Sequence, residues 1–344
     1  MNPLEISKLF RVSGRFSEAH PFGNGHINDT FRIRNEVPGS PDYVLQRINT
    51  HVFPEPEKLM ENMSGVISHI KHQKRYAHLV PELIETESGA FFVKTESGFW
   101  RMYRFVEGAK SFDRAENEQQ VWEGGFANGS FLKALESFPI EKLYTVIPDF
   151  HNMVTRIRQF EEALETTSKE RKEWAFDEII SIQKKKATWI KMFQSAVTGN
   201  IPVRVTHNDT KFNNVLLSEH SKKSCVIDLD TVMPGYTFFD IGDGLRSAVI
   251  SANENESDLS LVVVNEHFYQ SYIDGFIDGS DGLLTSEEKQ LIPKSGGYMA
   301  FIMAVRFLTD FLKGDIYYKT HYAEHNLGRA KNQLYVSALF EGIS

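Results

Sequence analysis

The sequence predicts an α+β fold with two lobes, in which a small β-rich N-terminal lobe precedes a larger, mainly helical C-terminal lobe. Up to about residue 107, apolar and polar residues alternate in short runs that are typical of strands. After residue 113 the apolar residues recur at helical spacing instead. The 344 residues exceed the usual size of one domain, yet no Pro- or Ser-rich linker interrupts them. Two lobes in close contact therefore fit better than two tethered domains.

Residues 1–107 predict strands around one helix. The strand-like runs are 16–20, 30–36, 43–48, 90–95 and 99–106. Between the third and fourth runs, apolar residues at helical spacing predict a helix over 57–72. The alternation ends at Glu107-Gly108, so we place the boundary there and expect lobes of residues 1–107 and 108–344.

The remainder of the chain reads as mostly helical. The segments with helical spacing are 113–126, 149–165, 170–198, 257–279 and 285–313. One stretch, 203–230, differs because the apolar runs 215–217 and 225–227 predict two short strands joined by a polar turn. This predicted hairpin presents the motif at 207–214.

Composition excludes several classes of function. The chain has 38 basic and 46 acidic residues, a net charge of −8, and its Lys and Arg residues are scattered, so we expect no nucleic-acid partner. The first residues lack the apolar core of a signal peptide, and no apolar run approaches the roughly 20 residues that span a bilayer. Cys225 is the single cysteine, which excludes a disulfide within one chain. A cytoplasmic protein that does not bind membranes is expected.

The motif H-N-D-T-K-F-N-N at 207–214, followed by Asp228 at the end of an apolar run, carries the strongest chemical signal. Phosphoryl transfer from a nucleotide requires a carboxylate for the attacking hydroxyl, oxygen ligands for Mg²⁺ and a cation on the transferred group. We assign these roles to Asp209, to Asn214 with Asp228, and to Lys211, respectively. His207 is expected to hold the loop. The alternative is a turn capped by its own Asn and Asp side chains.

Residues for the nucleotide phosphates are expected in the N-terminal lobe. The tip Gly23-Asn24-Gly25-His26 lies between two predicted strands, and glycine there permits backbone N–H groups to approach phosphates closely. The same pattern also occurs in ordinary hairpin turns. No Walker A string is present.

The third predicted strand contains Gln46 and Arg47. Arg47 is a candidate for a bidentate grip on phosphate. Because side chains alternate along a strand, only one of the two can face the nucleotide. Arg47 as a solvated edge residue is the alternative.

The segment F-D-I-G-D-G-L-R at 239–246 follows the predicted metal loop. Asp240 is expected to accept hydrogen bonds from the backbone of the catalytic loop, or else to cap the following helix. Asp243 and Arg246 are candidates for contact with the acceptor substrate.

Arg306 and Tyr317 are further acceptor candidates. Arg306 interrupts an apolar helical run, and a buried arginine requires a polar or anionic partner. An ion pair with Asp310, four residues later, explains its presence as well as substrate binding does.

The motif at 207–214 resembles the catalytic loop of protein-kinase-like enzymes, and its spacing is similar to that of the aminoglycoside phosphotransferase and choline kinase superfamily. The strings L-Q-R-I-N, P-D-F-H-N, H-N-D-T-K-F-N-N, D-L-D-T-V-M-P-G and F-D-I-G-D-G-L-R closely resemble those of N-acetylhexosamine 1-kinases. This resemblance runs from about Gly23 to Gln333. It implies a protein-kinase-like fold, ATP and Mg²⁺ as cofactors, and phosphorylation of the anomeric hydroxyl of GlcNAc or GalNAc. A monomer or homodimer that binds only small molecules is expected.

Two other functions stay open. An aminoglycoside or choline-type kinase would need acidic and aromatic side chains around a cationic acceptor, and the predicted arginines argue against it. A nucleotide-binding regulatory protein without catalysis is favoured only by the Gln-Arg pair in place of a strand lysine. The presence of Asp209, Asn214 and Asp228 opposes it.

Overall fold

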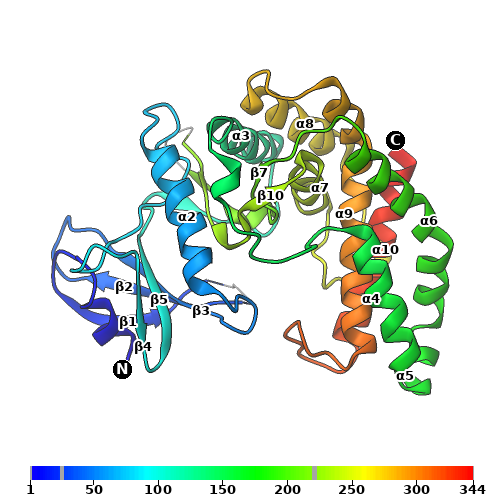
Figure 1. The fold of residues 1–344 in the computed structure, drawn as a ribbon, viewed down its shortest axis with the longest axis horizontal. Helices are drawn as coiled ribbons and strands as arrows, with labels where there is room; N and C mark the ends of the chain where they lie inside the picture. The colour runs from blue at the N-terminus through cyan, green and yellow to red at the C-terminus, as the bar shows by residue number, and fades with distance from the viewer. Residues whose placement is uncertain (1, 24–26, 219–222, 344) are drawn as a thin grey trace.

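The computed structural model describes residues 2–23, 27–218 and 223–343, and it consists of an N-terminal antiparallel sheet followed by a larger helical part (Figure 1). The predicted α+β fold is confirmed. The sheet lies at one end of the molecule and helices α4, α5, α6, α9 and α10 lie at the other, with α2 between them.

Five strands form the N-terminal sheet in the order β1-β2-β3-β5-β4, with antiparallel neighbours throughout. They are β1 (Phe16–Pro21), β2 (Asp29–Asn35), β3 (Tyr43–Ile48), β4 (Phe92–Thr95) and β5 (Gly98–Arg104). Each begins and ends within two residues of its prediction. The central pair, β3 with β5, places Gln46 directly opposite Arg101.

The two faces of this sheet pack against different partners. Tyr43 and Leu45 of β3 join Trp100 of β5 and the short helix α1 (Pro3–Ser7) in a small apolar core. The opposite face meets α2 (Pro56–Lys71), whose apolar side belongs to a cluster that continues into the helical part. Because that cluster is continuous, α2 joins the sheet to the rest of the molecule by apolar packing.

Short strands form the centre of the molecule. β6 (Ala109–Lys110) pairs with β8 (Val215–Ser218), which pairs with β9 (Cys225–Val226), and β7 (Arg204–Thr206) pairs with β10 (Met233–Gly235). The 3-10 turns η2 (Phe212–Asn214) and η3 (Leu229–Thr231) lie between these strands in the chain. This framework holds the motif at 207–214.

Helices make up most of the remainder. They are α3 (Glu118–Ala134), α4 (Met153–Thr166), α5 (Lys169–Trp174), α6 (Phe176–Thr198), α7 (Thr237–Ala248), α8 (Glu266–Ser280), α9 (Ser286–Leu312) and α10 (His325–Ile343), with the 3-10 turns η1 (Ile140–Lys142) and η4 (Leu259–Leu261). The central part of α9 is buried on all sides. Within the described ranges, none of the helices has the length and apolar character needed to cross a membrane.

Helices α3 and α8 contact each other through glycines. A Cβ at Gly125 would lie 2.3 Å from the carbonyl oxygen of Tyr272, and one at Gly279 would lie 2.3 Å from that of Phe126. Such separations are far below van der Waals contact. The absence of a side chain at these positions therefore allows the two backbones to approach closely.

Candidate active site

The segment after β7 is held by a buried carboxylate. Asp240 of α7 accepts hydrogen bonds from the backbone N–H of His207 at 2.9 Å and of Asn208 at 2.8 Å. Asn208 has a left-handed backbone with φ of 63°, and its side chain donates to the carbonyl of Thr231 at 3.0 Å. The predicted brace by Asp240 is confirmed. It fixes the direction in which the next residue, Asp209, leaves the strand.

His207 has a structural position, as expected. Its Nε2 lies 2.9 Å from the carbonyl oxygen of Ile227 and therefore donates, while Nδ1 accepts from the backbone N–H of Asp209 at 3.2 Å. Nε2 thus connects this loop to the residue before Asp228, and Nδ1 holds the backbone of the loop itself.

The structure brings Asp209, Lys211 and Asn214 together. The Asn214 carboxamide donates to the backbone carbonyl of Asp209 at 2.8 Å and to its Oδ2 at 3.0 Å, and Lys211 Nζ lies 3.3 Å from Oδ1. Burial acts to raise the pKa of Asp209, but Lys211, His207 and Arg246 outweigh it and the pKa is lowered. Asp209 raises the pKa of Lys211 in turn. An ionised carboxylate beside a cation is the arrangement required to orient a hydroxyl toward a phosphoryl group.

Asp228 lies close to this group at the start of η3. Its backbone is left-handed, with φ of 61°, a conformation that a non-glycine residue adopts at a free-energy cost of about 1–3 kcal/mol. The carboxylate keeps solvent-exposed surface, but surrounding protein limits its solvation. This desolvation and the negative charges of Asp230 and Asp209 raise the pKa of Asp228 to about 7.

These residues fit a magnesium ion that also binds nucleotide phosphates. A divalent cation would relieve the repulsion between Asp228 and Asp209, and Asn214 offers a carboxamide oxygen nearby. In the described ranges, no three His, Cys, Asp or Glu side chains are arranged to hold a metal without help. Mg²⁺ typically takes one or two protein ligands and completes its shell with water and phosphate oxygens, so the small ligand set suits it.

On the sheet, the structure separates Gln46 from Arg47. Gln46 lies on the face toward α2, where its Oε1 accepts from Arg101 Nε at 3.0 Å and Nη2 at 2.8 Å. Arg47 lies on the opposite face, half-exposed, where it pairs with Asp29 and lies over the ring of Trp100. Arg47 is therefore not brought together with the catalytic residues.

The glycine-bearing tip is described only in part. Gly23 is exposed and has a φ of 79°, with no atom near the position of an added Cβ. The predicted phosphate contacts Asn24, Gly25 and His26 lie outside the described residues. Asn28, at the foot of the tip, donates to Asp230 Oδ2 at 2.7 Å.

Asp243 and Arg246 form a buried ion pair on α7. Arg246 Nε lies 2.8 Å from Asp243 Oδ1, and its Nη1 lies 3.3 Å from Glu254 Oε2. Burial raises the pKa of Asp243 although Arg246 opposes it. Lys211 interacts electrostatically with all three groups, which places this cluster beside the catalytic loop. Glu254 lies in a polar stretch without a motif, so no sequence signal indicated it.

Arg306 does not pair with Asp310. The Asp310 carboxylate instead accepts from the backbone N–H groups of Ile316, Tyr317 and Tyr318 at 2.8–3.0 Å. The ion pair that sequence spacing allowed is therefore absent. Arg306 lies over the ring of Phe150, with Cζ 4.6 Å from its centroid, and 5.7 Å from that of Tyr318. Tyr317 is half-exposed.

A second arginine lies near Arg306. Arg156 of α4 donates to the carbonyl of Phe150 at 3.1 Å and to Gln159 Oε1 at 2.8 Å. Burial and the charge of Arg306 lower the pKa of Arg156 to about 10. Within the part of the chain that the structure describes, neither guanidinium has a carboxylate at ion-pair distance.

His151 connects these arginines to the catalytic loop. Its Nε2 donates to the carbonyl of Asn208 at 2.8 Å. Burial, with Arg306 and Arg156 adding to it, lowers the pKa of His151 to about 3, so the ring is neutral and Nδ1 is a bare acceptor. Among the described residues this Nδ1 and the buried hydroxyl of Tyr318 have no hydrogen-bond partner. This histidine belongs to the string P-D-F-H-N, which carries a family resemblance but no signal for the role of the side chain.

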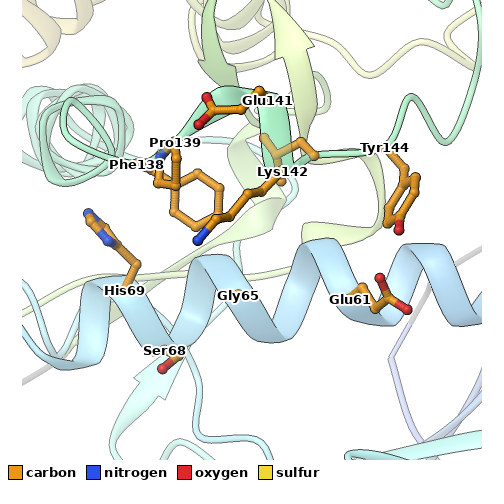
Figure 2. Close-up of a pocket in the computed structure, with 10 residues that line it drawn as sticks. Glu61, Gly65, Ser68, His69, Phe138, Pro139, Glu141, Lys142 and Tyr144 are labelled. Atoms are coloured by element: carbon orange, nitrogen blue, oxygen red, sulfur yellow. The ribbon is translucent and has the colours of Figure 1, made fainter.

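A separate recess of about 690 Å³ lies between the exposed side of α2 and residues 138–144. Figure 2 shows the side chains that line it, among them Glu61 and His69 of α2 and Lys142. No predicted site residue lines this recess, so it is distinct from the catalytic group.

A family model described as the phosphotransferase enzyme family matches residues 18–271. The chain belongs to this family. Among solved structures, an aminopropanol kinase associated with a microcompartment is 14% identical with a TM-score of 0.70, covering 98% of this chain and 96% of that chain. A spectinomycin phosphotransferase in complex with ADP and spectinomycin is 15% identical, with a TM-score of 0.64 and 98% coverage of both chains.

A choline kinase from Cryptosporidium parvum Iowa II is 13% identical, with a TM-score of 0.56, covering 95% of this chain and 90% of that chain. At such identities the structural matches establish the shared fold alone, whereas the family match identifies a phosphotransferase. The expected phosphotransferase family is confirmed, and the fold is shared with a spectinomycin phosphotransferase and a choline kinase. In a phosphotransferase, the group of Asp209, Lys211 and Asn214 has a direct chemical use.

Proposed function

We propose that this phosphotransferase is an ATP- and Mg²⁺-dependent kinase that phosphorylates the anomeric hydroxyl of an N-acetylhexosamine. The observation that carries the acceptor class is the pair Arg156 and Arg306, which lie beside the catalytic loop without carboxylate partners in the described residues. The strings shared with N-acetylhexosamine 1-kinases support the choice of sugar and of its C1 hydroxyl.

The positive charges of the two arginines favour an acceptor without an ammonium group. Two unit charges about 8 Å apart repel by roughly 2 kcal/mol at an effective dielectric constant near 20, and each guanidinium would contribute. A sugar amide carries no charge. Its carbonyl and hydroxyl oxygens can accept hydrogen bonds from the arginines.

In the proposed reaction, Asp209 orients the C1 hydroxyl and takes its proton, and Lys211 contacts the transferred phosphoryl group. Asn214 and Asp228 would hold Mg²⁺, which neutralises charge on the nucleotide phosphates when bound. Asp243, Arg246, Arg306 and Tyr317 are proposed to form the acceptor side.

The nucleotide phosphates are proposed to lie under the tip that contains Gly23, Asn24, Gly25 and His26. We propose that residues 1–107, which include this tip, form the nucleotide-binding lobe. Residues 108–344 then form the catalytic and acceptor-binding lobe.

The test is a panel of acceptors assayed by ADP release. GlcNAc and glucosamine form a matched pair, because GlcNAc carries an uncharged amide where glucosamine carries an ammonium group. We expect turnover with GlcNAc or GalNAc, much weaker turnover with glucosamine, and none with a methyl glycoside or the alditol, which lack a free anomeric hydroxyl. Phosphorus NMR should show coupling of the product phosphate to the anomeric proton. Phosphate on C6, or preferential use of choline or an aminoglycoside, would overturn the proposal.

Variants at the arginines test the charge argument. Arg306→Gln and Arg156→Gln should raise the KM for GlcNAc, leave the KM for ATP unchanged and reduce the discrimination against glucosamine. Arg158→Gln is a matched control, since Arg158 lies on the same helix but is exposed and paired with Glu162. If all three variants discriminate as the wild type does, the two arginines do not select the acceptor.

A further inference from the structure

Arg101 of β5 is a fully buried cation, with 0% of its side chain exposed. A buried guanidinium must be paired and hydrogen-bonded to be tolerated. Gln46 on the neighbouring strand supplies a neutral acceptor for two of its N–H groups. The adjacent residue of α2 is Met63, whose thioether lies 3.7 Å from Nη1 and carries no charge. Neither the sheet nor α2 therefore neutralises Arg101 at these contacts.

The anion for Arg101 comes from the metal loop. Asp230 Oδ1 lies 2.5 Å from Arg101 Nη1, and Asp230 is itself buried, with 4% of its side chain exposed. Among the described residues, the ion pair of the Arg101 guanidinium is with the carboxylate of Asp230. Asp230 stands two residues after Asp228, in the 3-10 turn η3.

The same carboxylate is also held by the loop that bears the glycine tip. Asn28 Nδ2 donates to Asp230 Oδ2 at 2.7 Å, and Asn28 Oδ1 accepts from the backbone N–H of Asn49, just after β3. Asp230 therefore contacts residues from β5 and from the foot of the tip between β1 and β2. Its two oxygens connect η3 to two parts of the N-terminal sheet.

The other side of η3 is attached to the catalytic loop. Thr231 Oγ1 donates to the carbonyl of His207 at 2.7 Å, and the carbonyl of Thr231 accepts from Asn208 at 3.0 Å. The turn thus has the N-terminal sheet on one side and the segment that carries Asp209 on the other. Asp228, in its left-handed conformation, immediately precedes this doubly attached turn.

We infer that Arg101 and Asp230 are a positioning pair, which aligns the metal loop with the nucleotide-binding strands across the junction between the sheet and the helical part. The inference rests on the proposed function, which assigns metal binding to Asp228 and nucleotide binding to the N-terminal strands. In this arrangement Arg101, on the face of the sheet toward α2, pairs with Asp230. The Asp230 carboxylate contacts both Arg101 and Asn28. Among the described residues, this pairing does not involve Asp228, which stays available to bind a cation.

The experiment measures binding of Mg²⁺-ADP and of metal-free ADP by calorimetry, without any acceptor. The central variant is the double substitution Arg101→Met with Asp230→Leu, because replacing both members of a buried pair by apolar residues usually preserves the fold. We expect its thermal unfolding to stay close to wild type and its affinity for Mg²⁺-ADP to fall about tenfold or more, as typical for loss of a partner that supports a metal ligand. Metal-free ADP should bind with a much smaller change.

Single variants and a control make the test specific. Arg101→Lys keeps the charge and should recover part of the affinity for Mg²⁺-ADP, whereas Arg101→Met should not. Arg75→Met is the control, because Arg75 forms an exposed 3.0 Å pair with Asp281 of the helical part and lies outside the proposed site. Its nucleotide binding should equal that of the wild type.

Two outcomes would overturn the inference. The double variant could bind Mg²⁺-ADP within about twofold of wild type, which would leave the pair a role in packing alone. It could also lose affinity equally for ADP with and without Mg²⁺, which would place the effect outside the metal loop. Failure of the proposed function looks different, since a wild-type protein that binds Mg²⁺-ADP but phosphorylates no sugar would refute the acceptor and leave the positioning pair intact.

Discussion

Three neighbours in the chain act on Asp209. Asn214 donates a hydrogen bond to the carboxylate of Asp209, and Lys211 favours its ionised form. His207 accepts a hydrogen bond from the backbone N–H of Asp209. Each neighbour comes from the same short motif. The residue is therefore positioned by local geometry and held ionised by local electrostatics.

Asp209→Asn should abolish phosphoryl transfer and leave nucleotide binding nearly unchanged. The amide keeps the shape of the side chain but can neither take a proton nor attract Lys211. Loss of the general base is expected to lower kcat by roughly 100-fold or more. Single-turnover assays with titration of Mg²⁺-ADP check this, and turnover within a few-fold of wild type would show that another group orients the hydroxyl.

His151 should make stability depend on pH. The pKa of His151 is about 3 in the folded protein and 6.5 ordinarily. Between these pH values the unfolded chain therefore binds a proton at His151 and the folded chain does not. The contribution of this group is therefore complete above pH 6.5 and is lost as the pH falls toward 3. By pH 5 the loss is about 2 kcal/mol.

The measurement is chemical denaturation of the wild type and of His151→Gln at pH 7 and pH 5. Glutamine does not titrate and can still donate to Asn208. The variant should lose less stability than the wild type between the two pH values, whatever its stability at pH 7. Equal losses would mean that His151 is protonated in the folded protein.

Whole elements were predicted where their apolar residues follow a period. Strand β3 and helix α2 match because their buried residues recur at strand and helical spacing, respectively. Helices α7 and α10 were not predicted. Almost every residue of α7 is buried, and α10 buries polar as well as apolar side chains, so neither shows an amphipathic stripe.

Helix boundaries depended on features that periodicity does not contain. The predicted helix 257–279 begins only at Glu266, where the Asn265 side chain accepts from the backbone N–H of Phe268 at 3.1 Å. The predicted helix 170–198 is divided at Ala175 into α5 and α6. Caps and breaks of this kind follow from single hydrogen bonds and backbone angles.

The glycine contact between α3 and α8 should be sensitive to one added methyl group. In Gly279→Ala the Cβ would lie 2.3 Å from the carbonyl oxygen of Phe126, so the helices must separate. Overpacking of this kind typically costs about 1–3 kcal/mol. Gly342→Ala on α10 has no atom within 4 Å of its added Cβ and serves as the control.

Thermal and chemical unfolding of both variants test this contact. Gly342→Ala should match the wild type or exceed it slightly, because alanine restricts the unfolded chain. If Gly279→Ala is as stable as that control, the close approach of the two helices adds nothing to stability.

At the scale of the whole molecule, the N-terminal sheet and the helical part are joined by the apolar side of α2 and by the buried pair Arg101–Asp230. The proposed nucleotide and metal ligands come from both parts. Binding of Mg²⁺-nucleotide should therefore stabilise the molecule as one unit.

Mg²⁺-ADP should raise the unfolding temperature in a magnesium-dependent way. A ligand at 100 times its Kd adds about 2.7 kcal/mol of stability when it binds only the folded state. Asp228→Ala should remove most of the magnesium dependence, and Asn214→Ala should weaken it less, because a carboxylate is the stronger ligand for a hard cation. Scanning calorimetry at varied Mg²⁺ measures the effect, and unchanged magnesium dependence in both variants would contradict the metal site.

The sequence by itself determined the fold class and the grouping of the polar side chains in the motif at 207–214. Periods of two and 3.6 residues depend on neighbours a few positions apart, and Asp209, Lys211 and Asn214 fall within one loop, so short spacing already brings them together. Asp228 could be added because it ends the apolar run that follows. Such groups require no knowledge of how distant segments pack.

Only the tertiary structure decided which residues surround that group. It placed Gln46 rather than Arg47 toward α2, paired Arg101 with an aspartate 129 positions later, and brought Arg156 close to Arg306. It also used Asp310 to cap the segment at 316–318 instead of pairing it with Arg306. These outcomes depend on long-range burial, because a charge removed from water takes whichever partner the packing of the chain brings within reach.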